Sequence, residues 1–98
     1  MFARIVKMTF QTEKIDLFLD NFHKNKQKIR NFEGCVSLEL FRDKNDRSTF
    51  FTYSWWKAED DLNKYRNSDL FKTVWSETKI LFSDKPEAWS IDKIESLP

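Results

Sequence analysis

The chain is short and almost neutral, with 98 residues, 17 Lys and Arg, 16 Asp and Glu and a formal net charge of +1. This length predicts a single domain over residues 1–98, and the absence of a clustered basic excess argues against a nucleic-acid partner. The one cysteine, Cys35, excludes an internal disulfide and argues against a zinc site. No stretch approaches the roughly 20 apolar residues of a membrane span, so we expect a cytoplasmic protein.

The aromatic content is high for a chain of this size, with ten Phe, four Trp and two Tyr. Each ring can bury roughly 150–250 Å², so together they exceed what the core of a small monomer needs. We expect a partner chain or a ligand to cover the excess.

The N-terminal third predicts a strand followed by a long helix. Residues 3–10 alternate with apolar side chains on both faces, and Thr12 is the expected N-cap of a helix that runs to about Asn31. The basic cluster at residues 24–30 lies at the end of that helix, where it complements the helix dipole; an anion site is the alternative interpretation. Gly34, the only glycine, follows where the chain must reverse.

The middle of the chain predicts a β-hairpin. Residues 35–43 alternate, residues 43–47 form a polar turn, and residues 48–56 are rich in β-branched and aromatic side chains. Both faces of the second arm are aromatic: one carries Phe50 and Trp56, and the other carries Phe51, Tyr53 and Trp55.

The C-terminal part predicts a helix in two pieces and a last strand. Lys57-Ala58 opens a short helix with an acidic first turn, and Ser68 is the expected N-cap of the second piece. An apolar stripe runs through residues 70–82 of that piece. Residues 83–86 break the helix, and residues 88–94 alternate as a strand.

The resulting order is β-α-β-β-α-β with the second helix split. It predicts an α+β fold of the ferredoxin-like type, an antiparallel sheet with both helices on one face. In a monomer the other face of such a sheet is polar. Because these strands are apolar on both faces, we expect a homodimer in which a second sheet covers the face that the helices leave open.

A few positions around the second helix carry a resemblance to a known family. Trp56 ends a strand, an acidic helix start follows, Tyr65 comes nine residues after the Trp, and Ser68 and Phe71 form a Ser-x-x-Phe pattern. This spacing resembles the antibiotic biosynthesis monooxygenase (ABM) domain family, which has a His or an aromatic residue at the position of Tyr65. The turn at residues 32–35 resembles the Pro-Gly-Cys-like turn of the family, with Glu in place of Pro.

The resemblance implies a dimeric α+β barrel, in which two sheets close face to face and each protomer has a pocket between sheet and helices. Family members include cofactor-independent monooxygenases that act on quinols and anthrones, haem-degrading enzymes, and proteins of unknown role. The implied function is therefore a cofactor-independent monooxygenase that acts on a small aromatic or quinol-like substrate. The alternative is a non-catalytic module of the same fold that binds a small ligand or a partner.

The haem-degrading branch of the family resembles this chain at residues 67–72. That branch uses an Asn on the first strand, a Trp just before this run and a His shortly after it. The aligned positions here are Val6, Tyr65 and Trp75. Because Trp75 cannot ligate iron, the resemblance does not extend to haem degradation by that route. Haem binding without degradation is a third interpretation.

Tyr65 and His23 are the candidate catalytic residues. Tyr65 stands at the His or aromatic position of the family and would donate a hydrogen bond to a substrate oxygen; packing of its ring on the sheet is the alternative. His23 is the only imidazole, and hence the only unperturbed base near neutral pH. It lies beside the apolar stripe of its helix, which favours an exposed, inert histidine over a catalytic one.

Five aromatic residues are candidates for substrate contacts: Phe22, Trp56, Phe71, Trp75 and Phe82. Aromatic residues at helix or strand spacing also build ordinary core, which is the alternative. Trp55 and Trp56 point to opposite faces, and the family spacing assigns Trp56 to the pocket and Trp55 to the dimer side. The chain has no Gly-rich phosphate loop, paired-carboxylate motif or nucleophile triad, and we expect neither a metal nor a cofactor.

Overall fold

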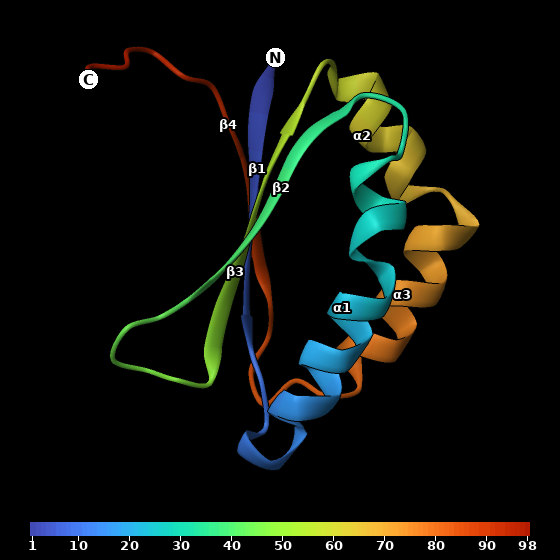
Figure 1. The fold of residues 1–98 in the computed structure, drawn as a ribbon, viewed down its shortest axis with the longest axis vertical. Coiled ribbons are helices and arrows are strands. Elements are labelled where there is room, and N and C mark those ends of the chain that lie inside the picture. The colour runs from blue at the N-terminus through green and yellow to red at the C-terminus, as the bar shows by residue number, and fades with distance from the viewer.

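The computed structural model describes all residues from 1 to 98 and has an α+β architecture. A four-stranded antiparallel sheet with strand order β2-β3-β1-β4 packs on one face against the helices (Figure 1). The elements are β1 (Phe2–Thr9), the 3-10 turn η1 (Thr12–Lys14), α1 (Ile15–Arg30), β2 (Cys35–Arg42), β3 (Thr49–Trp56), α2 (Glu59–Arg66), α3 (Asp69–Lys79) and β4 (Glu87–Ile91). The predicted ferredoxin-like order and the split second helix are confirmed. None of these helices combines the length and the apolar character needed to cross a bilayer.

The strand register decides which side chains face the helices. β1 pairs with β3 so that Arg4 lies opposite Ser54 and Ala3 lies opposite Trp55. Because successive side chains of a strand point to opposite faces, Arg4, Ser54 and Trp56 share the helix-covered face and Trp55 lies on the other. The predicted division of the two neighbouring tryptophans is therefore correct.

The hydrophobic core between sheet and helices forms two separate clusters. The larger lies at the end of the sheet near the β2–β3 hairpin turn and contains Met8, Phe10, Ile15, Phe18, Phe50 and Leu81. The smaller lies where α2 approaches the sheet and contains Cys35, Trp56 and Leu62. The middle of the layer belongs to neither cluster, and the candidate site lies there.

One of the two predicted helix caps is right. The Ser68 hydroxyl accepts a hydrogen bond from the Phe71 amide at 3.1 Å, which starts α3 as expected. Thr12 does not cap α1, because the chain first makes the 3-10 turn η1 and α1 begins only at Ile15 with no side-chain cap. The Thr12 hydroxyl instead lies 3.5 Å from the hydroxyl of Ser48, at the end of the hairpin turn.

The chain leaves α3 earlier than its apolar stripe suggested. The helix ends at Lys79, and Phe82 forms an isolated β-bridge with Phe10. The Ser83 amide donates to the Thr9 carbonyl at 2.9 Å, so this segment continues the edge of the sheet rather than the helix. The last strand covers only Glu87–Ile91, which is shorter than the predicted 88–94.

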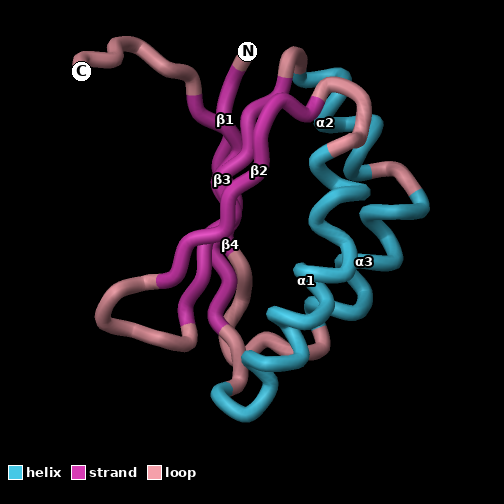
Figure 2. Tube along the Cα trace, viewed as in Figure 1, coloured by secondary structure: helices cyan, strands magenta, loops and turns pink.

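The sheet face opposite the helices is uncovered and largely apolar. Figures 1 and 2 show all helices on one side of the sheet, and no helix on the other. Phe41, Trp89 and Ile91 are 50%, 42% and 41% exposed on this face. Tyr53 contacts Phe41 and Trp55 edge to face, with ring centroids 6.4 and 5.9 Å away. The strands are thus apolar on both faces in the folded chain, and the face without helices exposes aromatic side chains.

Candidate active-site cavity

A cavity of about 370 Å³ lies between the sheet and the helices. It separates the two core clusters, since Met8 and Phe18 of the larger and Trp56 and Leu62 of the smaller both line it. Its volume is near the lower end of the roughly 300–1,000 Å³ typical of small-molecule sites. This size favours a small ligand.

The cavity exists because the centre of the sheet presents short side chains to the helices. Val6, Thr52, Ser54 and Ala88 line it from three adjacent strands, with Val6 paired to both Thr52 and Ala88. Bulky residues stand at either end of the same rows, where Met8 pairs with Phe50 and Phe2 pairs with Trp56. The helices therefore rest on the two ends and leave the middle unfilled.

One side of the cavity is an aromatic wall, which we define as Trp56, Tyr65, Phe71 and Trp75. Trp56 stacks on Tyr65 with centroids 5.3 Å apart, and Phe71 meets Tyr65 edge to face at 5.2 Å. Trp75 continues the series by stacking on Phe71 at 5.8 Å. These rings come from β3, α2 and α3, so the wall forms only when all three elements pack together.

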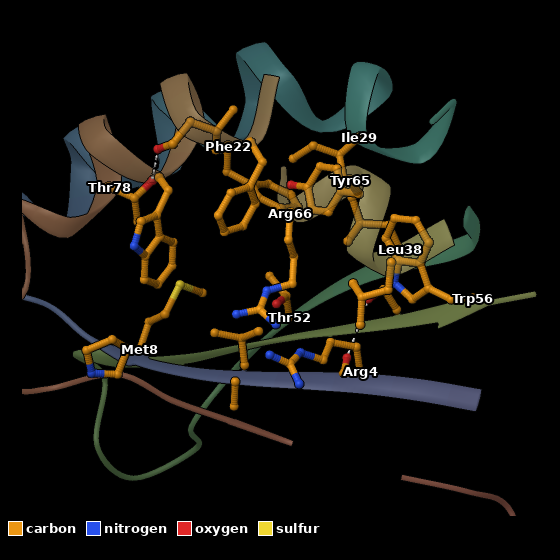
Figure 3. A pocket seen from close by; sticks show the side chains of 18 of the residues that line it. Arg4, Met8, Phe22, Ile29, Leu38, Thr52, Trp56, Tyr65, Arg66 and Thr78 are labelled. Atoms are coloured by element: carbon orange, nitrogen blue, oxygen red, sulfur yellow. Dashed lines mark hydrogen bonds between the residues drawn. The ribbon is translucent and has the colours of Figure 1, made fainter. Parts of the chain in front are cut away.

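Tyr65 is the polar member of the wall. Figure 3 shows its hydroxyl directed toward Phe22, into the space between helices and sheet. Burial, and next the neighbouring Cys35, raise the pKa of the Tyr65 phenol well above its ordinary value of 10.0. The phenol therefore stays protonated at neutral pH, and its chemistry is that of a hydrogen-bond donor rather than a base.

Two guanidinium groups reach the same cavity, and sequence reasoning missed both. Arg4 comes from the helix-facing side of β1 and Arg66 from the end of α2, and Figure 3 shows them extending toward each other across the space. Burial, and next the charge of Arg66, lower the pKa of Arg4. One feature of the sequence could have predicted the place of Arg4 in the cavity: it is a charged residue in the apolar row of Phe2, Val6 and Met8.

The structure brings most of the predicted site residues together and leaves two outside. Tyr65, Phe22, Trp56, Phe71 and Trp75 all line the cavity. His23 is exposed on α1 and is not among the lining residues, because its position on the helix turns it to solvent. Phe82 packs against the larger core cluster instead, with its ring 5.3 Å from Phe10 and 5.6 Å from Trp75.

The donor set of the chain offers no metal centre, since no three His, Cys, Asp or Glu side chains gather in one place. Cys35 is buried, and its thiol donates to the Ser37 carbonyl at 3.6 Å. Burial is the largest influence on this thiol and raises its pKa, which disfavours the thiolate that metals bind.

Solved structures from several bacteria and an archaeon share this fold. The chain superposes with a TM-score of 0.88 on a putative antibiotic biosynthesis monooxygenase from Nitrosomonas europaea, at 15% identity over 97% of this chain and 100% of that one. A conserved protein from Methanosarcina mazei Go1 gives a TM-score of 0.88 at 20% identity over 95% and 93% of the two chains. At such low identities these similarities concern the fold alone.

A second similarity involves sequence. The chain is 34% identical over 53 residues to a "Heme oxygenase (staphylobilin-producing)" of Staphylococcus epidermidis, which is 53% of this chain and 49% of that protein. The match thus spans about half the length of this curated relative. The family model described as antibiotic biosynthesis monooxygenase matches residues 1–75, which include β1 to α2 and most of α3. The chain belongs to the antibiotic biosynthesis monooxygenase family.

Proposed function

We propose that the protein is a cofactor-independent monooxygenase that acts on a small aromatic or quinol-like substrate. The observation that carries this proposal is the position of the Tyr65 hydroxyl, the one hydroxyl group in the aromatic wall of a ligand-sized cavity. Flat electron-rich molecules stack well on such a wall. Membership in the antibiotic biosynthesis monooxygenase family supports the same type of reaction.

The chemistry needs nothing beyond substrate and dioxygen. In an anthrone-type substrate, one atom of O₂ becomes a new carbonyl oxygen on the reactive ring carbon. The other atom leaves as water with the two hydrogens of that carbon. The substrate supplies the four electrons that O₂ takes up, so no separate reductant takes part.

Within this reaction Tyr65 is proposed to donate a hydrogen bond to the substrate oxygen, where negative charge develops when the phenol or enol ionises. Such a donor stabilises charge most effectively in a cavity with little water. The surrounding rings exclude water and orient the ring plane of the substrate. His23 has no part in this proposal, since its exposed position keeps it away from the cavity.

Haem chemistry is not part of the proposal, although the relative from Staphylococcus epidermidis is a haem oxygenase. The only imidazole of the chain, His23, is exposed and outside the cavity, and Trp75 lines the cavity with a side chain that cannot ligate iron. The residues present therefore do not fit a histidine-ligated haem.

We also propose that two copies of the chain pair through the uncovered sheet face to form the dimeric α+β barrel. The exposed rings of Phe41 and Trp89 support this arrangement, because contiguous apolar surface of this kind is typical of an interface. Pairing would bury the rings on the outer side of β3 as well, including Tyr53 and Trp55.

The test of the activity is oxygen consumption with a panel of anthrones and quinols, with ¹⁸O₂ to follow the atom that enters the product. Tyr65→Phe should lower kcat by about 10²-fold, the loss expected for one oxyanion donor. Tyr53→Phe is the matched control, because it removes the only other phenol of the chain, on the outer face of the sheet. No turnover on any substrate, or equal rates for the Tyr65 variant and the wild type, would contradict the proposal.

A non-catalytic ligand-binding module is the second candidate. The observation in its favour is the donor set of the cavity, which includes no imidazole and only one carboxylic residue, Glu87. Binding of aromatic ligands by calorimetry without any oxygen uptake would favour this candidate over the enzyme.

A further inference from the structure

The charges around the cavity are unbalanced. Arg4 and Arg66 both line it, and the only acidic residue that contributes to its lining is Glu87. Glu87 pairs with Lys7 in the β1–β4 register, whereas the cavity-facing row on these strands contains the pair Val6 and Ala88. Because side chains alternate along a strand, the Glu87 side chain belongs to the other face of the sheet, as Lys7 does. The two guanidinium groups therefore face the cavity without a carboxylate between them.

Arg4 is held in place from both sides. Its Nη1 donates to the Ser90 hydroxyl of β4 at 3.0 Å, and its carbonyl accepts from the Ser54 hydroxyl of β3 at 3.5 Å. A neutral partner leaves the positive charge of a guanidinium uncompensated, and Arg4 uses one of its five N–H groups on Ser90. The remaining donors are free to bind an anion, and arginine matches the planar carboxylate well.

The two halves of the cavity thus differ in chemistry. The aromatic wall offers ring faces, and the space between Arg4 and Arg66 offers positive charge beside the small residues Thr52 and Ser54. We propose that the cavity takes an amphipathic aromatic acid: its ring system packs on the aromatic wall, and its carboxylate or other fixed oxyanion lies between the guanidinium groups of Arg4 and Arg66. This inference deepens the proposed function and rests on the same cavity being the substrate site.

The test compares two probes of the same shape, 2-naphthoate and its neutral counterpart 2-naphthamide, by isothermal titration calorimetry at low salt. The wild type should bind naphthoate at least about tenfold more tightly, since hydrogen bonds to charged groups have that effect or more. Arg66→Gln and Arg4→Gln should each abolish most of the preference. Lys64→Gln is the matched control, because it removes one positive charge from the exposed side of the same helix without touching the cavity.

Equal affinity for the two probes, no binding of either, or an unchanged preference in both arginine variants would overturn the inference. A preference lost equally in Lys64→Gln would also overturn it, because net charge alone would then explain the result. The outcome is independent of catalysis. Anthrone turnover without an anion preference would overturn the aromatic-acid inference and leave the monooxygenase proposal standing. An anion preference without turnover would support the aromatic-acid inference and contradict the monooxygenase proposal.

Discussion

A buried hydrogen bond joins Trp56 to Ser54: the indole Nε1 donates to the serine Oγ at 3.0 Å. Trp56 is 1% exposed, so this bond is the only means of satisfying its N–H. The partner lies two residues earlier on the same face of β3, and its short side chain also keeps the cavity open. A single serine thus fixes the first ring of the aromatic wall and leaves room beside it.

Ser54→Ala should therefore destabilise the protein by about 1–3 kcal/mol, because the buried indole N–H loses its acceptor. The free energy of unfolding in urea measures this loss. Ser76→Ala removes an exposed hydroxyl of α3 that donates to the Thr73 carbonyl and should change stability by less than about 0.5 kcal/mol. Equal losses in the two variants would contradict the role of the buried bond.

Tyr65 should make the free energy of unfolding decrease as the pH becomes alkaline. The pKa of Tyr65 is raised in the folded protein. Its contribution to the free energy of unfolding is therefore fully present below the ordinary phenol pKa of 10.0, and it is lost as the pH rises above that value because the unfolded chain then releases the proton more readily. The unfolding midpoint of the wild type in urea should fall more steeply between pH 9 and 11 than that of Tyr65→Phe. Parallel curves for the two proteins would refute this assignment.

Filling the cavity from the sheet should block binding without loss of stability. Thr52 faces the cavity from the middle of β3, and Thr52→Leu adds apolar volume where space exists. We expect affinity for 2-naphthoate to fall at least tenfold, with an unchanged or slightly higher Tm in calorimetry. Thr73→Leu on the exposed side of α3 should leave the affinity unchanged. Wild-type affinity in Thr52→Leu would place the ligand elsewhere.

Gly34 should tolerate no side chain. Its φ of +88° is in the left-handed region, and an added Cβ would overlap Asp61 at the start of α2. Gly34→Ala should cost at least about 1–2 kcal/mol from the backbone alone, with the overlap adding to it. Gly34→Asn separates the two effects, since Asn accepts positive φ more readily yet still overlaps Asp61. Full stability of the Asn variant in urea would show that only the backbone angle matters.

The proposed dimer should dissociate when charge is placed on the uncovered sheet face. Phe41 is 50% exposed there, and Phe41→Lys should raise the dissociation constant at least tenfold because an unpaired ammonium is costly in an apolar interface. Light scattering behind a sizing column measures the mass directly. Ile80→Lys, at a site 69% exposed beyond the end of α3, should leave the mass unchanged. A monomeric wild-type protein would end the proposal.

The sequence by itself determined the order of the elements, the hairpin, the Ser68 cap and the faces of the strands. These features follow from short-range patterns: a period of two in strands, helical spacing in α1 and α3, and a serine before an apolar run. The same alternation separated Trp55 from Trp56. Thr12 and residues 80–82 were misjudged. The chain makes a 3-10 turn before α1 begins, and the β-bridge of Phe82 depends on Phe10, a partner far away in the sequence.

Only the tertiary structure decided where the cavity lies and what charge it carries. Val6, Thr52 and Ala88 are scattered along the chain, and strand register alone aligns their short side chains beneath the helices. The same packing brings Arg4 of β1 near Arg66 of α2, a pair that no local pattern could connect. The early end of α3 likewise places Phe82 against the larger core cluster and not in the lining of the cavity. Local patterns fix which face a residue occupies, and packing fixes which residues it meets.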